Sequence, residues 1–313
     1  MAENLQAPAK GVASYDQVKK EHKLYFNIVE RRKLWYSISL TVILAGLISL
    51  FAQGLNFGID FTGGDMIDIK FDTVVKQADI SKALESVDLK GSVQLSAGDT
   101  EAIIRTEVLE ETKRDELLKT IQEDVATYDT KMLKEDKVGP SIGVELRNDA
   151  FKALAVATVL MLIYISFRFK FIYAVTGIIA LLHDVFITIG VFSILQWQID
   201  ASFVAAILTV FGYSINDTVV IFDRIRENEK RMKKRDSFKE MIDKSVWQTM
   251  HRSVNTTVTV LIALFAIFIF GGVSTKVFAF AMLIGVFSGA YSSIFIASQL
   301  IVTIKGKLGE ISK

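Results

Sequence analysis

The sequence predicts a polytopic α-helical membrane protein with six transmembrane helices and one α+β domain outside the membrane. Hydrophobic residues make up 51% of the 313-residue chain, which is high for a soluble domain. Six apolar windows are long enough to cross about 30 Å of hydrocarbon, which takes roughly 20 helical residues. About a hundred residues between the first two windows are too many for a simple connection, so they predict a separate domain.

The six windows comprise residues 34–53, 151–169, 171–195, 199–222, 253–272 and 277–304. One such window would fit a buried helix of a soluble protein, but six indicate a membrane protein. They divide the chain into an N-terminal segment 1–33, the first helix, a domain at 54–150, five helices at 151–304, and a tail at 305–313. The first window lacks a clear cleavage site, so we expect a retained helix and not a signal peptide.

Lysine and arginine set the predicted orientation. The stretches "RRK" at 31–33, "RFK" at 168–170 and "EKRMKKR" at 229–235 lie on one side of the windows, whereas the turn "QWQID" has no cation. The positive-inside rule therefore places both termini in the cytoplasm and residues 54–150 outside. We expect the basic loop at 223–252 to form a surface helix. Its charge follows from topology and contact with anionic lipid, without a nucleic-acid partner.

The order of patterns in residues 54–150 predicts a ferredoxin-like fold. "MIDIKFD" alternates apolar Ile67, Ile69 and Phe71 with polar residues, as in a half-buried strand. "DISKALESV" and "TKRDELLKTIQEDVATY" have helical apolar stripes, and "SVQLS", "EAIIRT" and "KVGPSIG" are predicted strands. The resulting order is β-α-β-β-α-β. With 12 Lys and Arg against 21 Asp and Glu, the domain is acidic, which favours solubility over recognition of a basic ligand.

The motif "GIDFTGGD" precedes the first predicted strand. Its glycines Gly58, Gly63 and Gly64 permit tight turns or positive φ angles beside Asp60. The motif lacks the Lys-Ser/Thr pair of a phosphate-binding loop, and no such loop occurs elsewhere, so the chain has no nucleotide-driven motor. The absence of cysteine excludes disulfides, thiolate metal sites and cysteine nucleophiles. We predict neither a metal site nor catalytic residues.

Asp217 lies inside the fourth window, within "GYSINDTVVIFDRIREN". A carboxylate near the centre of a membrane helix costs about 2.5–3.5 kcal/mol, and no cation lies one turn away on the same helix. The fifth window begins on the same side with "MHRSVNTT", so antiparallel packing would bring Arg252 near the depth of Asp217. Burial favours the protonated carboxyl and a guanidinium favours the charged one. These opposed effects predict a proton-exchanging carboxylate; the alternative is a static ion pair.

The third window contains "LLHD", which places His183 and Asp184 near its middle. From the outside inward, Asp200, Asp184 and Asp217 form a series of acids that could carry protons across the membrane. The alternatives are a neutral His183 ring bonded to a backbone carbonyl, and a simple interfacial position for Asp200.

Small residues recur every four positions in the last window, and Gly285 and Gly289 are its two glycines. Such a stripe allows another helix to approach closely. The neighbour is expected either within the same bundle or in another subunit. The complete stripe comprises Ala281, Gly285, Gly289, Ser293 and Ala297.

The motifs "GIDFTGGD", "VGPSIGVELRNDA", "GYSINDTVVIFDRIREN" and "HRSVNTTVTVLIAL" together resemble the SecF family of the bacterial Sec protein-export system. The resemblance extends from residue 24 to residue 305. This family belongs to the resistance-nodulation-division superfamily, so the six helices are implied to form half of a twelve-helix bundle that SecD completes. Asp217 matches the acidic residue of helix 4 and Arg252 the basic residue of helix 5, both implicated in proton coupling. Asp184 falls in a family-like stretch.

The resemblance implies an auxiliary, non-enzymatic translocase subunit in the bacterial cytoplasmic (inner) membrane. The proton-motive force, and no bound cofactor, is implied to help draw preproteins through the SecYEG channel, while SecA supplies the ATP-driven push. The implied partners are SecD, SecYEG, preproteins, membrane lipid and, indirectly, YajC and SecA. Protonation of Asp217 would release Arg252, shift helices 4 and 5, and act on the exported domain through helices 1 and 2.

Two other functions fit parts of the sequence. A half-transporter of the same superfamily, for a lipid or a small molecule, would need a large apolar cleft in the exported domain. A structural, non-energised partner of the translocon would need neither Asp217 nor Arg252, so their substitution would be silent.

Overall fold

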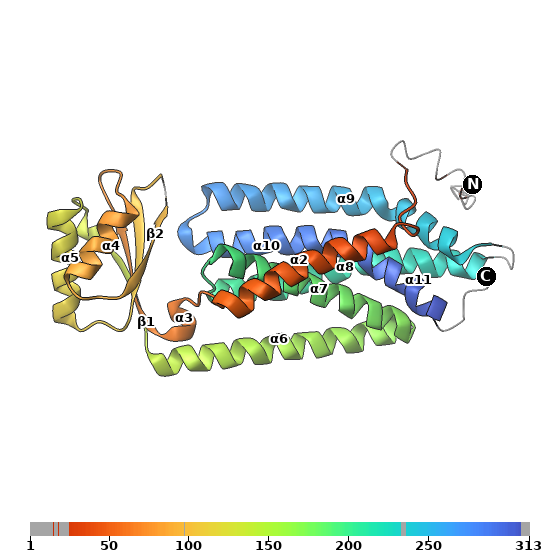
Figure 1. Ribbon diagram of the computed structural model, residues 1–313, viewed down its shortest axis with the longest axis horizontal. Helices are drawn as coiled ribbons and strands as arrows, with labels where there is room; N and C mark the ends of the chain where they lie inside the picture. Colours follow the sequence, from red (N-terminus) through yellow and green to blue (C-terminus); the bar gives the residue numbers. More distant parts are fainter. Residues whose placement is uncertain (1–14, 16–17, 19–24, 97, 233–235, 308–313) are drawn as a thin grey trace, which may run out of the picture.

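The computed structural model describes residues 15, 18, 25–96, 98–232 and 236–307. Six of the helices in these ranges are long and apolar enough to cross a membrane. They run side by side in an elongated bundle, with a small α+β domain at one end (Figure 1). The predicted fold class is therefore confirmed. Most of the expected N-terminal segment 1–33 and the end of the tail 305–313 lie outside the described residues.

Each of the six long helices overlaps most of one predicted window. The chain enters the fourth of them through Asp200, whose carboxylate accepts a hydrogen bond from the Phe203 amide (3.1 Å), as an N-cap residue does. Gly271 and Gly272 separate the fifth helix from the sixth. The helices are α2 (Arg32–Gln53), α6 (Pro140–Arg168), α7 (Phe171–Leu195), α8 (Ala201–Arg231), α9 (Phe238–Phe270) and α10 (Val273–Ser292), which a π-helical segment (Ser293–Ala297) joins to α11 (Ser298–Lys307).

Several helices extend beyond the apolar windows. Helix α6 begins at Pro140 and not at Phe151. The basic segment at 223–252 is largely helical, as expected, but its helical residues are continuations of α8 and α9 and not a loop. Arg224 and Asn228 of α8 both donate to Gln248 of α9, at 2.7 and 2.9 Å. These bonds satisfy polar side chains along the antiparallel pair, so the helices persist where hydropathy ends.

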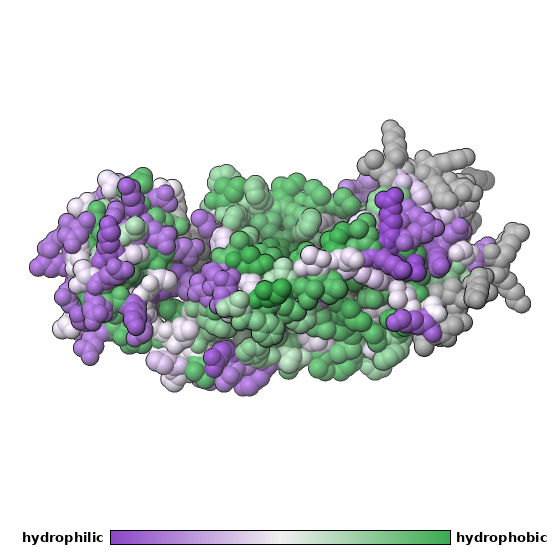
Figure 2. Space-filling model, viewed as in Figure 1, coloured by the Kyte–Doolittle hydropathy of each residue, from purple (hydrophilic) through white to green (hydrophobic). Residues whose placement is uncertain are grey.

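The interior of the bundle is formed by α7, α8 and α10, which contain most of its buried residues. Helices α2, α6 and α9 expose many large apolar side chains. Hydrophobic residues accordingly cover the middle of the molecule, and hydrophilic residues gather at both ends (Figure 2). Helices α2 and α7 approach closely at Gly46 and Gly190, where a Cβ on either glycine would lie 2.7–2.8 Å from the other's Cα.

The domain at the end of the bundle has the predicted β-α-β-β-α-β order and a ferredoxin-like, fully antiparallel sheet with strand order β2-β3-β1-β4. Ile67, Ile69 and Phe71 point into its core, as their alternation predicted. The last strand ends at Val138, whereas "KVGPSIG" was expected to supply it; Pro140 instead starts α6. The elements are β1 (Gly64–Lys70), α4 (Gln77–Ser86), β2 (Gly91–Ser96), β3 (Glu101–Thr106), α5 (Glu111–Asp124) and β4 (Lys134–Val138).

The α+β domain presents its sheet, and not its helices, to the bundle. Helices α4 and α5 lie on the side of the sheet that points away from the membrane helices (Figure 1). A short helix, α3 (Ile59–Thr62), lies between the end of α2 and the start of β1 and packs against α6. The motif "GIDFTGGD" therefore occupies the junction between the two parts of the molecule.

Candidate functional site

Asp217 is buried between α8 and α9, with 6% of its surface exposed. Its nearest polar neighbour on α9 is Ser253, and Arg252 acts on it electrostatically. Its Oδ2 atom has no hydrogen-bond partner among the described residues. A buried carboxylate oxygen without a donor is unusual, because buried polar groups are nearly always paired. The hydrogen bonding of Asp217 therefore differs from that of a buried carboxylate with a purely structural role.

Arg252 lies near Asp217 but does not form a direct ion pair with it among the described residues. Its side chain is exposed, and the interaction between the two residues is electrostatic only. Antiparallel packing of α8 and α9 thus places Arg252 at the expected depth, while the static ion pair that the sequence left open is not formed.

Asp217 belongs to a row of polar groups along the contact between α8 and α9. Tyr213 lies one turn away on α8 and faces Thr257 and Asp217. The hydroxyls of Tyr213, Ser253 and Thr257, like Oδ2 of Asp217, are buried and make no well-aligned hydrogen bond in the described part of the chain. Ser253 nevertheless lies close enough to interact with Asp217, and Thr257 with Tyr213. Ordered water is the usual partner of such groups. The row is thus a polar track in an otherwise apolar helix contact.

Asp184 lies in the centre of the bundle and is completely buried. Its Oδ1 accepts hydrogen bonds from Ser288 (2.8 Å) and from Nδ1 of His183 (2.9 Å). Its Oδ2 accepts from Ser214 (2.6 Å) and Ser292 (2.8 Å). Four donors therefore satisfy both carboxylate oxygens by hydrogen bonds alone. Asp184 consequently joins α7, α8 and α10 at one point.

His183 extends this network to α2. Its Nδ1 lies 2.9 Å from Oδ1 of Asp184, and its Nε2 lies 3.0 Å from the Ser39 hydroxyl on α2. Ser39 is also 3.4 Å from the Tyr291 hydroxyl, which donates to the carbonyl of Trp35. The alternative of a His183 ring bonded to a backbone carbonyl is therefore wrong; its partners are a carboxylate and a serine.

Sequence reasoning identified Asp184 and His183 but missed the serines that bind them. Ser288 and Ser292 each follow a glycine of the small-residue stripe by three positions, so they occupy the neighbouring face of α10. That spacing was the available signal. It is not specific, because serine is also an ordinary small residue in helix contacts.

The small-residue stripe itself packs inside this bundle. A Cβ on Gly289 would lie 3.0 Å from the Cβ of Ser214, and Gly285 faces Val210, both on α8. The stripe ends in the π-helical segment, where Ser293 bonds to Thr218 at 2.7 Å. Such segments inside α-helices are frequent at functional sites. Close packing here brings Ser214 within reach of Asp184.

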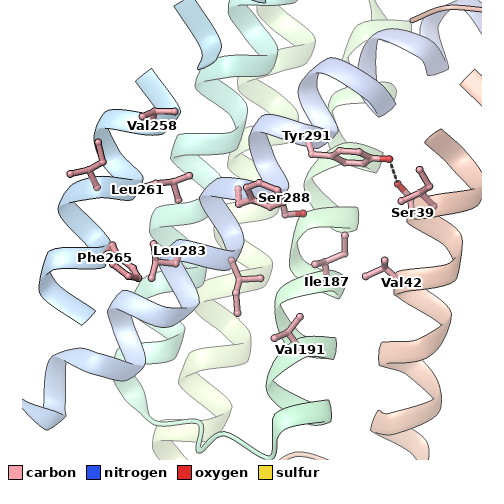
Figure 3. A pocket seen from close by; sticks show the side chains of 14 residues that line it. Ser39, Val42, Ile187, Val191, Val258, Leu261, Phe265, Leu283, Ser288 and Tyr291 are labelled. Carbon is pink, nitrogen blue, oxygen red and sulfur yellow. Dashed lines mark hydrogen bonds between the residues drawn. The ribbon is translucent and has the colours of Figure 1, made fainter. Parts of the chain in front are cut away.

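An apolar groove of about 880 Å³ lies between α2 and α9, above α7 and α10 (Figure 3). Val258, Leu261 and Phe265 of α9 form one wall, and α2 forms the other. Ser39 and Tyr291, joined by a hydrogen bond, lie at one end of the groove (Figure 3). No residue that lines the groove is charged, and two of the lining residues, Ser39 and Ser288, bond directly to His183 and Asp184.

The motif "GIDFTGGD" contacts the start of α8. The amide of Gly58 donates to the carbonyl of Ile199 (2.7 Å), and the carboxylate of Asp60 accepts from the amide of Ala201 (2.8 Å). Gly63 and Gly64 have φ angles of 75° and 138°, which favour glycine. The positive φ angles were predicted; the role of Asp60 in capping another helix was not.

The described residues contain no group of three or more His, Cys, Asp or Glu that could hold a metal ion. Asp200, Asp184 and Asp217 do not form one continuous chain of contacts. Asp200 bonds to Ser202 and Phe203 at the end of α8, whereas Asp184 and Asp217 have separate sets of neighbours. The proton series from Asp200 to Asp217 therefore stays a prediction that these contacts do not support.

Comparison with known proteins places the chain in a family. The family model "Protein export membrane protein SecD/SecF, C-terminal" matches residues 117–307, and the "SecD/SecF GG Motif" matches residues 48–73. The protein translocase subunit SecF of Sebaldella termitidis is 40% identical over 284 residues, 89% of this chain and 91% of the relative. That of Acidaminococcus fermentans is 41% identical over 290 residues, 90% of this chain and 98% of the relative.

The structure agrees with these sequence matches. The crystal structure of SecDF from Thermus thermophilus, described as a translocon-associated membrane protein, superposes with a TM-score of 0.82 at 33% identity. The match covers 91% of this chain and 39% of the SecDF chain. SecDF in a super-membrane-facing form matches with a TM-score of 0.69 at 32% identity and covers 92% of this chain. From both its sequence and its fold, the chain belongs to the SecF family of protein translocase subunits.

Proposed function

We propose that this protein works with SecD in the cytoplasmic membrane of a bacterium and uses the proton-motive force to promote preprotein export through the SecYEG channel. Proton exchange at Asp217 drives the cycle. In this role the protein is not an enzyme and needs no bound cofactor, because the gradient is the energy source. SecA and YajC act on the same pathway without a direct contact being required.

The observation that carries the proposal is the unsatisfied Oδ2 of Asp217 inside a row of unpaired hydroxyls. Asp184 accepts four hydrogen bonds, whereas the neighbouring hydroxyl of Asp217 on α9 is that of Ser253. Protonation of Asp217 supplies a hydrogen-bond donor and removes a buried charge. Water along Tyr213, Ser253 and Thr257 supports transfer of that proton to and from the carboxylate.

Arg252 sets the affinity of Asp217 for the proton. Its positive charge favours the carboxylate, and movement of the guanidinium away from it favours the protonated form. A shift of α9 relative to α8 therefore couples proton binding to helix position. One elementary charge crossing 100 mV provides about 2.3 kcal/mol, which is enough to change the ratio of two helix positions by roughly fiftyfold.

SecD is the partner we propose for the open face of α8 and α9. Arg252 is exposed on that face, and an exposed arginine at membrane depth needs a polar neighbour. The SecDF structure that matches this chain holds further chain beyond the matched 39%. A twelve-helix unit in which SecD supplies the other six would cover Arg252 and complete the proton path.

A half-transporter for a lipid is less well supported. One cavity of the exported domain has a volume of about 550 Å³ and is lined mainly by charged residues. An apolar substrate would need an apolar cleft. The charged lining comprises Asp65, Glu111, Arg114, Glu135, Asp136 and Lys137.

The test is preprotein translocation into vesicles containing SecYEG, SecA, SecD and this protein, with and without a proton gradient. We expect Asp217→Asn to assemble normally and to lose gradient-stimulated translocation. Glu227→Gln is the matched control, since this carboxylate of α8 is partly exposed and pairs with Arg224 and Arg231 on its own helix. Full stimulation in Asp217→Asn would refute the coupling role and favour a structural one.

A further inference from the structure

The junction between the bundle and the exported domain is held by contacts that begin directly before α8. The Gly58 amide donates to the Ile199 carbonyl at 2.7 Å, and the Ile199 amide donates to the Asn56 carbonyl at 2.8 Å. Phe57 and Ile199 thereby form a short parallel β-bridge. The segment that leaves α2 is thus paired with the residue two positions before α8 begins.

Asp60 strengthens this attachment at the first residue of α8. Its carboxylate accepts the Ala201 amide at 2.8 Å, while Asp200 accepts the Phe203 amide at 3.1 Å. The first amides of a helix lack partners within the helix, and its dipole is positive there. Two carboxylates therefore stabilise the outer end of α8, and one of them belongs to the motif and not to α8.

The other end of the motif is fixed to the exported domain and to α6. A Cβ on Gly63 would lie 2.7 Å from the Cα of Pro140, and one on Gly64 would clash with the carbonyl oxygen of Thr106 in β3. No side chain fits at either place, so the backbones are in direct contact. Displacement of the motif must therefore carry β1, β3 and the start of α6 with it.

Arg105 adds an electrostatic contact across the same junction. It projects from β3 and interacts with Asp200, which precedes α8, and with Asp60 of the motif. Burial lowers the pKa of Arg105, and these two carboxylates oppose that effect. The sheet of the exported domain is thus joined to α8 by charge as well as by backbone contacts.

We infer that residues 56–64 form a rigid joint that transmits movement of α8 to the exported domain, with Asp60 as the positioning residue that holds the joint to α8. Ala201 and Asp217 lie on the same helix and are 16 residues apart, about 24 Å at 1.5 Å per residue. A shift of α8 at Asp217 therefore reaches the joint without passing through α2 or α6. This inference rests on the proposed proton coupling at Asp217.

The experiment measures proton entry and translocation in the same SecD-containing vesicles for Asp60→Ala, Asp60→Asn and Asp115→Ala. We expect Asp60→Ala to keep proton entry near the wild-type rate and to lose gradient stimulation about fivefold or more. Asp60→Asn should recover most of the stimulation, because the amide oxygen still accepts the Ala201 amide. Asp115, an exposed residue of α5, is the control and should behave as wild type.

Two outcomes of this experiment overturn the inference. Full stimulation in Asp60→Ala shows that the joint does not transmit movement, and equal loss of proton entry and translocation shows a general structural defect. If the wild type itself shows no gradient stimulation, the proposed function fails and not the joint.

A second variant keeps the test decisive if Asp60→Ala does not assemble. The chain has no cysteine, so Phe57→Cys/Ile199→Cys permits one disulfide across the β-bridge. A rigid joint stays paired throughout the cycle, so oxidation should leave stimulation unchanged. Stimulation that is blocked by oxidation and restored by reduction would show that the joint opens, which contradicts the inference.

Discussion

Asp184 and Asp217 show how one residue type serves two purposes inside a membrane. Asp184 is fully buried and accepts four hydrogen bonds. Asp217 is nearly as buried but has an oxygen with no partner among the described residues. Both residues carry the same electrostatic cost of burial. Asp184 offsets that cost through fixed donors, which is why we assign it a structural role and propose Asp217 as the proton-binding residue.

We predict that Asp184→Asn destabilises the bundle. The amide replaces two accepting oxygens with one and adds two donors that face the serine hydroxyls. The loss should be on the order of 3 kcal/mol, as for other buried charged hydrogen-bond networks. Thermal unfolding in detergent measures it, with Ser292→Ala as a milder comparison because it removes one donor only. A stable Asp184→Asn variant that loses proton-coupled export would instead make Asp184 a coupling residue.

At the scale of elements, the contact between α8 and α10 determines the geometry of the site. Gly285 faces Val210 and Gly289 faces Ser214, so the two helices pack with little between their backbones. Because Ser214 and Ser292 approach Asp184 from opposite helices, the spacing of α8 and α10 fixes the hydrogen bonds of the carboxylate. Close packing of small residues, and not hydrophobicity, therefore determines how α8 and α10 are positioned against each other.

A double-mutant cycle tests this contact. In Gly285→Ala the new Cβ would lie 2.8 Å from Cγ1 of Val210 and still closer to Cγ2, so overpacking should cost about 1–3 kcal/mol. Val210→Ala in the same chain makes room for the methyl group. We expect the double variant to lose less unfolding free energy than the two single variants lose together, by about 1 kcal/mol or more. Simple additivity in thermal unfolding would mean that the helices do not meet there.

The sequence predicted the elements better than their junctions. Hydropathy located all six membrane helices, and the alternation around Ile67 and Ile69 predicted β1. The sequence did not predict that α8 and α9 extend through the polar loop. The hydrogen bonds of Arg224 and Asn228 to Gln248 form only when the two helices pack against each other. The same reason explains why Asp60 was taken for part of a turn: its partner, Ala201, lies 141 positions away.

At the scale of the whole molecule, α2 begins and α11 ends at the end of the bundle opposite the exported domain (Figure 1). An even number of spans requires this arrangement. The helix extensions around residues 223–252 lie at that same end and carry many of the cations. Combined with the positive-inside rule, this arrangement predicts that the α+β domain lies on the side of the membrane opposite the cytoplasm.

Cysteine labelling tests that orientation directly, because the chain has no cysteine of its own. Lys131 in the exported domain and Lys239 at the start of α9 are both exposed. A membrane-impermeant maleimide should label Lys131→Cys in spheroplasts and Lys239→Cys only in inverted vesicles. The reverse pattern would invert the topology and with it the direction of proton flow through Asp217.

The most direct measurement of the central claim is proton entry during translocation, recorded with a pH-sensitive dye in vesicles that contain SecYEG, SecA, SecD and this protein. The account predicts that wild type admits protons as preprotein moves, and that Asp217→Asn abolishes both the proton entry and the gradient-stimulated movement while the complex remains assembled. Proton entry that persists in Asp217→Asn would contradict the account, because the carboxylate could then not be the site through which the gradient drives export.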